Sequence, residues 1–291
     1  MKRPAWVLVG TRLRPAAAVC VAPWSPAVRR GAGLLETVGC DGGRALMLGA
    51  HLERMRAGAG ALGWRLPDLP GDRDVERLLS RERLAGPAAL RVLALDDGPR
   101  LRVIAWAESV TVATRLRRKG SRLYPVVMAS GPLAGVKSSS YLPQRWAAGV
   151  AGGAGADAAL LIDGDGAVRE SDHANIFALV GAEVLTPPSP ARCLPGVMRR
   201  WTIETLRAGG VSVVERDLTL AELQAAGGAW LTSSLEGIVP VRQVGGTTLP
   251  YPAAMLRVLG SAGIPAPGYA GGSAGRARSG VASWRVRRPR A

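Results

Sequence analysis

The residue with the clearest chemical potential in this chain is Lys137, which stands in the stretch G-V-K-S-S-S-Y at residues 135–141. Basic charge is carried almost wholly by arginine, and the lysines and histidines are only five: Lys2, His51, Lys119, Lys137 and His173. An amine, unlike a guanidinium, can lose its proton, attack a carbonyl carbon and form a Schiff base. Taken alone, the stretch rather favours a surface lysine between a Gly/Pro-rich loop and a helix, and only the rest of the chain indicates otherwise.

Three further features in the second half of the chain could act together with Lys137. Glu170 stands where a short strand is expected to end, after the tight-turn sequence D-G-D-G at residues 163–166. The sequence L-P-G-V-M-R at 194–199 starts a helix, and the free N–H groups of a helix N-terminus can bind phosphate. A hydroxyl-rich turn, T-S-S-L-E-G at 232–237, precedes a strand. Each feature taken singly is common in α/β proteins.

Hydrophobic periodicity predicts mixed α and β structure throughout the chain. In the first half it predicts strands at 5–9, 16–22, 34–38, 45–48, 90–95 and 101–108, helices at 51–62 and 74–84, and an irregular stretch at 110–133. In the second half it predicts helices at 142–152, 197–208, 218–226 and 251–260, with strands at 158–162, 167–169, 176–180, 183–186, 211–215, 229–232 and 238–241. We therefore expect a smaller α/β domain (1–125), a connection (126–136), a larger domain (137–262) and a disordered basic tail (263–291).

Composition excludes several other classes of protein. With 291 residues, 47% hydrophobic and 21% charged, the chain is globular. Its net charge of +16 raises nucleic acid as a partner, but the arginines are dispersed outside the tail, so we do not expect that role. The three cysteines show neither zinc-site nor disulfide spacing, and no metal site is expected. No signal peptide or membrane-length apolar run is evident, and we expect a cytoplasmic protein.

In their order and spacing, these motifs resemble those of the class IV aminotransferases, the fold-type IV enzymes that use pyridoxal 5'-phosphate. The family pattern is a Schiff-base lysine, then G-x-V-x-E-x-x-x-x-N-x-F, L-P-G-x-x-R and a hydroxyl turn before P-V. Here these are Lys137, residues 166–177, 194–199 and 232–241, and H-L-E-R-M at 51–55 resembles the family's phosphate-arginine helix. The resemblance covers residues 31–245. It implies two domains with the cofactor at their interface, a small-molecule substrate and a homodimer.

The resemblance also implies a role for each matched residue. Lys137 would bind the cofactor covalently and act as acid and base at the substrate Cα, while Glu170 would pair with the pyridine nitrogen. The other cofactor-binding residues would be Arg54, Val197, Met198 and Ser234 at the phosphate, Tyr141 near the phenolic oxygen and Leu194 on the ring face. The alternatives are a surface ion pair for Arg54, for example with Glu53, helix packing for Tyr141 and a solvated strand end for Glu170. His51 and His173 are interpreted as structural.

Three local sequences make 4-amino-4-deoxychorismate lyase the preferred member of the family. L-L-E-T at 34–37 resembles the lyases' F-E-T, whose threonine is implicated in proton transfer, so Thr37 is a catalytic candidate. L-P-G-V-M-R and S-L-E-G-I-V-P-V also resemble lyase forms. Residues 24–30 lack the family's usual sequence, which puts substrate identity in doubt. The alternatives are an aminotransferase acting on branched-chain or D-amino acids with 2-oxoglutarate, a family member with altered or lost activity, and a basic scaffold.

Overall fold

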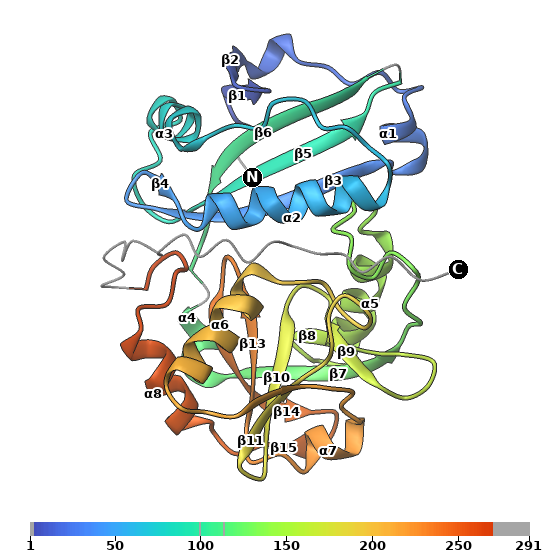
Figure 1. Cartoon of the computed structure of the whole chain (residues 1–291), viewed down its shortest axis with the longest axis vertical. Helices are drawn as coiled ribbons and strands as arrows, with labels where there is room; N and C mark the ends of the chain where they lie inside the picture. The colour runs from blue at the N-terminus through green and yellow to red at the C-terminus, as the bar shows by residue number, and fades with distance from the viewer. Residues whose placement is uncertain (1–2, 99, 113, 270–291) are drawn as a thin grey trace.

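The computed structural model describes residues 3–98, 100–112 and 114–269. Its strands form two separate sheets, which Figure 1 shows one above the other, with α2 along the side of the first sheet that faces the second. The sheets hold six and nine strands, and each has its own buried apolar core. This two-sheet α/β architecture agrees with the fold class predicted from the sequence.

The first sheet is antiparallel throughout, in the order β2-β1-β6-β5-β3-β4. Its strands are β1 (Trp6–Val9), β2 (Arg12–Pro15), β3 (Gly33–Asp41), β4 (Arg44–Ala45), β5 (Ala88–Asp96) and β6 (Leu101–Ser109). The helices of this part are η1 (Ala16–Ala18), α1 (Pro26–Arg30), α2 (Leu48–Ala61) and α3 (Asp72–Arg81). The apolar faces of α2 and α3 join the core of this sheet, which is why their sequences show helical periodicity.

The second sheet is mixed, in the order β12-β11-β10-β13-β14-β7-β8-β9, with β15 paired to β14. Its strands are β7 (Ser121–Val127), β8 (Ala158–Ile162), β9 (Val168–Ser171), β10 (Asn175–Val180), β11 (Glu183–Thr186), β12 (Val213–Glu215), β13 (Ala229–Ser233), β14 (Gly237–Val244) and β15 (Thr247–Thr248). Its helices are α4 (Thr114–Lys119), α5 (Leu142–Gly153), α6 (Val197–Ala208), α7 (Leu220–Gln224) and α8 (Ala253–Ser261). Every residue of β8 is buried, as its unbroken apolar sequence requires.

Several expectations from the sequence need correction. Of the strand expected at 45–48, only Ala45 lies in a strand, and Leu48 already begins α2. The strand expected at 16–22 is instead the short helix η1 followed by irregular chain, and β2 lies just before it. The stretch 110–133 is not irregular, because it contains α4 and β7. Since β7 pairs with β8 and β14 of the second sheet, a domain division at 125 falls inside a strand of that sheet. We propose instead that the larger domain begins with α4, whose Leu116 packs against the core of the second sheet.

Residues 263–269 are also not part of a disordered tail. Ile264 and Ala266 are buried, and the Gly268 N–H donates to Asp41 of β3 at 2.8 Å. Tyr269 bonds through its hydroxyl to the backbone N–H of Ile238 in β14 at 3.1 Å. This segment therefore ties the end of the chain's second part to the first sheet. The rest of the expected tail, residues 270–291, lies outside the described residues.

Within the described ranges, no helix has both the length and the apolar character that crossing a membrane requires.

Candidate active site

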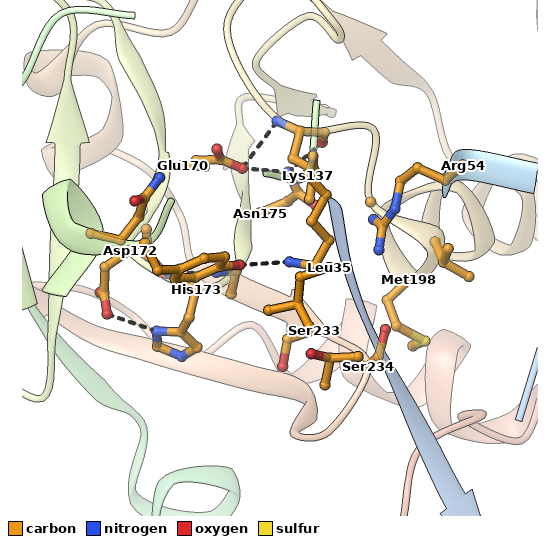
Figure 2. A pocket seen from close by; sticks show the side chains of 18 of the residues that line it. Leu35, Arg54, Lys137, Glu170, Asp172, His173, Asn175, Met198, Ser233 and Ser234 are labelled. Carbon is orange, nitrogen blue, oxygen red and sulfur yellow. Dashed lines mark hydrogen bonds and ion pairs between the residues drawn. The ribbon is translucent and has the colours of Figure 1, made fainter. Parts of the chain in front are cut away.

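A cavity of about 470 Å³ is lined by residues of both sheets and of the loop that carries Lys137. All of the residues singled out from the sequence line it: Thr37, Arg54, Lys137, Tyr141, Glu170, Leu194, Val197, Met198 and Ser234. Figure 2 shows Lys137, Glu170 and Asn175 on one side of this space and Ser233, Ser234 and Met198 on another. Segments separated by up to about two hundred residues in the sequence thus meet at one pocket.

Lys137 is held in place by pairing with the edge of β3. The Leu35 N–H donates to the Lys137 carbonyl at 2.9 Å, and the Ser139 N–H donates to the Gly33 carbonyl at 2.9 Å. Thr37 lies two residues beyond Leu35, and alternate residues of a strand point to the same face. The Lys137 amine donates to the Tyr141 hydroxyl at 2.6 Å, from four residues away in the chain. The backbone pairing therefore brings the lysine and Thr37 to the same cavity.

Glu170 is the acid of the site, and it lies in β9. Its Oε2 accepts from Asn175 Nδ2 at 3.1 Å and from the Leu194 N–H at 3.2 Å. Among the described residues, Oε1 has no hydrogen-bond donor. Burial raises the pKa of Glu170 from 4.5 to about 7, against the Leu194 bond and the charge of nearby Arg169, which lower it. Among the described residues the Glu170 carboxylate forms no ion-pair contact, so it is a suitable partner for a cationic ring nitrogen.

The N-terminus of α6 also lines the cavity. Val197 and Met198 are both 2% exposed, and no side chain caps the helix. The N–H groups of a first helical turn have no partner within the helix. The cap residue is Gly196, and a β-carbon there would overlap the Asn175 side chain. Glycine at this position therefore allows Asn175 to approach the helix start and reach Glu170.

Arg54 is buried, and its ion pair is neither at the surface nor with Glu53. Its Nε and Nη2 donate to Glu36 at 2.8 and 2.6 Å, and its Nη1 donates to the Pro195 carbonyl at 3.1 Å. Although burial opposes the charged form, pairing with Arg54 and His51 lowers the pKa of Glu36 to about 2. The guanidinium fork expected at a phosphate thus binds Glu36 here. Its role as a phosphate ligand stays a proposal.

His51 belongs to the same cluster, although the sequence interpretation left it as structural. Its Nδ1 lies 2.7 Å from Glu36 Oε2, and its Nε2 lies 3.2 Å from Ser234 Oγ. Burial lowers the pKa of His51, so we assign a neutral ring that donates to Glu36 and accepts from Ser234. A serine has one hydroxyl hydrogen, so Ser234 cannot also donate to a phosphate in this arrangement. The signal that could have identified His51 is its position three residues before Arg54 on the same helix.

Thr37 has a charged neighbour that the sequence did not reveal. Arg91 is its partner in the pairing of β3 with β5, and Arg91 Nη1 donates to Thr37 Oγ1 at 2.8 Å. Arg91 Nε donates to Glu108 at 3.0 Å. Both Thr37 and Arg91 line the cavity. The strand register thus places a guanidinium beside the hydroxyl that is the catalytic candidate.

These groups suit a planar pyridine ring that bears a phosphate ester. Glu170 Oε1 could accept from a protonated ring nitrogen, and Lys137 could reach an aldehyde carbon. At the phosphate end, Val197 and Met198 offer N–H groups next to Ser234. Thr232 Oγ1 lines the same cavity, is buried and has no hydrogen-bond partner among the described residues. An unsatisfied buried hydroxyl costs free energy, and a bound phosphate oxygen would satisfy it.

Comparison with known proteins agrees with this picture. Residues 33–244 match the family described as Amino-transferase class IV. A bifunctional aminodeoxychorismate lyase and D-amino acid transaminase of Mycobacterium tuberculosis is 27% identical over 250 residues, 76% of this chain and 84% of that protein. A putative branched-chain-amino-acid aminotransferase of Methanocaldococcus jannaschii is 36% identical over 114 residues, 39% of this chain. The chain spans only 40% of the length of this archaeal relative.

Solved structures show the same fold. The branched-chain aminotransferase of Thermoproteus uzoniensis with norvaline superposes with a TM-score of 0.80 at 21% identity, covering 88% of this chain and 92% of that one. The PLP-bound form of a hypothetical aminotransferase from Mycobacterium tuberculosis superposes with a TM-score of 0.77 at 24% identity, covering 89% and 98%. At these identities the likeness extends to the fold alone.

Proposed function

The chain belongs to the Amino-transferase class IV family, and we propose that it is a pyridoxal 5'-phosphate-dependent 4-amino-4-deoxychorismate lyase. The reaction would release 4-aminobenzoate and pyruvate, a step of folate synthesis. The observation that carries the proposal is Thr37, whose hydroxyl lines the cavity on the strand that Lys137 pairs with. The lyase-like turn at 232–241 and the name of the mycobacterial relative support it.

When bound, the cofactor would withdraw electrons from the substrate carbon that bears the amino group. Lys137 Nζ would remove the proton from that carbon, and Tyr141, 2.6 Å from Nζ, would orient the amine. Departure of enolpyruvate from the neighbouring carbon aromatises the substrate ring. Enolpyruvate then takes up a proton to become pyruvate, and Thr37 would deliver it. Arg91, bonded to Thr37, would hold the hydroxyl in position and add positive charge for an anionic substrate.

Glu170 and the cluster around Arg54 would fix the cofactor. We propose that Glu170 pairs with the ring nitrogen and Leu194 packs on the ring, while Val197, Met198, Ser234 and Arg54 surround the phosphate. The Glu36 pair links β3 and α2 to the Pro195 carbonyl at the start of α6, so it joins the two sides of the cavity. By resemblance to the family, we also propose a homodimer. The three widely spaced cysteines, which form no disulfide framework, support the separate proposal of a cytoplasmic location.

The alternative is an aminotransferase acting on branched-chain or D-amino acids. It is favoured by the name of the archaeal relative and by the dual name of the mycobacterial one. In transamination the proton that Lys137 removes would return at a different atom, the amino group would pass to 2-oxoglutarate, and the substrate would lose no carbon fragment. The two activities share Lys137 and Glu170 and differ in the need for Thr37.

The test is release of 4-aminobenzoate and pyruvate from enzymatically generated aminodeoxychorismate by the purified, cofactor-loaded protein. We expect both products in equal amounts, loss of both with Lys137→Ala, and a fall of about 10²- to 10⁴-fold in kcat with Thr37→Ala, as is usual for a positioned proton donor. Lys137→Ala should also remove the cofactor absorbance that borohydride bleaches in the parent protein. Amino-group transfer to 2-oxoglutarate without pyruvate release would replace the lyase proposal with the aminotransferase.

A further inference from the structure

Three charged side chains form a chain of contacts across the cavity lining, and the proposed reaction uses none of them. His173 Nδ1 lies 3.2 Å from Asp172 Oδ2, and His173 Nε2 lies 3.1 Å from Glu236 Oε2. All three residues line the cavity. Asp172 and His173 lie between β9 and β10, just beyond Glu170, whereas Glu236 lies in the turn that carries Ser234. The contacts therefore join two walls of the site.

The histidine in this chain of contacts carries a positive charge. Both of its ring nitrogens face carboxylate oxygens, which only accept, so both must donate, and this requires the imidazolium. Although burial opposes the charge, the bonds to Asp172 and Glu236 raise the pKa of His173 to about 10. Neither carboxylate has an ion pair with any other cation among the described residues. His173 therefore neutralises one of the two carboxylates by direct contact, while the charge of Arg117 acts on Glu236 without an ion-pair contact.

The Asp172 carboxylate and the backbone of Glu236 are also held in fixed positions. Asp172 Oδ1 accepts from the Ala159 N–H at 2.8 Å. Arg117 Nε donates to the Glu236 carbonyl at 2.8 Å, and the Glu236 N–H donates to Ser233 Oγ at 3.2 Å. The Glu236 side chain is 24% exposed and the His173 side chain 37%. The Glu236 carboxylate is therefore accessible to solvent and to the cavity, and among the described residues its hydrogen-bond partner is His173.

We propose that His173 is a specificity-determining residue that neutralises and retains the Glu236 carboxylate so that the cavity accepts an anionic substrate. This inference rests on the proposed function, because the substrates of both candidate reactions carry carboxylates. Without the imidazolium, the carboxylate of Glu236 would face the substrate's carboxylate across a partly desolvated cavity, where like charges repel. His173 would act through Glu236 rather than touch the reacting atoms.

The experiment measures anion binding to the cofactor-loaded protein, by the change in cofactor absorbance on titration with 2-oxoglutarate. We expect His173→Gln to weaken binding about tenfold, the effect of one uncompensated charge in such a site, and 0.5 M salt to reduce this difference. Adding Glu236→Gln to His173→Gln should restore binding to within about twofold of the parent. In the lyase assay the same variants should change KM and leave kcat within about twofold. Arg216→Gln, which breaks an exposed ion pair with Glu222 at 2.8 Å, is the matched control and should change nothing.

Unchanged anion binding by His173→Gln would overturn the inference. Weakened binding that Glu236→Gln does not restore, or an equal loss of cofactor affinity, would also overturn it, because His173 would then be only structural. The titration requires bound cofactor but no turnover. Failure of the lyase assay with normal, charge-dependent anion binding would therefore reject the proposed reaction and leave the inference standing.

Discussion

Replacing Glu36 by glutamine removes a single negative charge and should destabilise the protein at neutral pH. Glu36 is fully buried, and its carboxylate binds Arg54 and His51. The lowering of its pKa from 4.5 to about 2, at about 1.4 kcal/mol for each unit, corresponds to about 3–4 kcal/mol of folding free energy. Removing one partner of a buried pair costs a similar amount, about 3–5 kcal/mol, because the other charge is left uncompensated. We expect a loss of about 3 kcal/mol.

The pH dependence of this loss follows from the direction of the pKa change. A carboxyl group whose pKa is lowered on folding contributes stability above its unfolded pKa and loses it as the pH falls through the folded value. The difference in unfolding free energy between the parent and Glu36→Gln should therefore be complete above pH 5. It should shrink progressively between about pH 4.5 and pH 2.

Urea unfolding of the cofactor-free proteins, followed by circular dichroism across this pH range, measures the effect. Glu222→Gln is the matched control, because the pKa of Glu222 is also lowered to about 2, chiefly by a side-chain bond from Arg216. That pair is 43% and 33% exposed, so solvent screens it, and its loss should cost less than about 1 kcal/mol. Gln at this position also retains the capping interaction with Thr219. Equal losses of unfolding free energy in the two variants would refute the reasoning that burial makes the Glu36 ion pair strongly stabilising.

Two further substitutions test the site's construction. Glu170→Gln should abolish turnover yet stabilise the cofactor-free protein above pH 7, because a pKa raised from 4.5 to about 7 makes the parent lose stability as the pH rises through that interval. We expect a gain of about 1–2 kcal/mol, since Glu170 is only half-buried. Urea titrations of parent and variant at pH 5 and 8 measure this, and a difference in unfolding free energy between the two proteins that is the same at both pH values would contradict it. Gly237→Ala should destabilise by about 1–3 kcal/mol and weaken cofactor binding, because φ at Gly237 is +68° and a β-carbon there would lie 2.9 Å from Ala266 and against the Tyr269 ring. Gly246→Ala, with open space around it, is the control, and an equal effect of the two alanines would show that the Tyr269 contact is unimportant.

The sequence alone determined the chemistry that the site contains. Lys137, the acid at Glu170, the helix start at 196–198 and the hydroxyl turn at 232–237 are each marked by short-range signals, such as a glycine-rich loop, a tight turn or a helix cap. Their presence in one cavity agrees with the resemblance to the family. Regular helices such as α5 and α6 were also predicted to within about a residue, because their periodicity is local.

Only the tertiary structure decided which distant groups face one another. Arg54 binds Glu36 rather than Glu53, Arg91 meets Thr37 through the register of β3 and β5, and His173 meets Glu236 across two turns. The same holds for β7, which joins the second sheet, and for residues 263–269, whose apolar side chains are buried against it. Strand register and packing between elements depend on the whole chain, because burial is a property of a surface and its partner together. Local sequence specifies one surface of each contact, and the fold supplies the other.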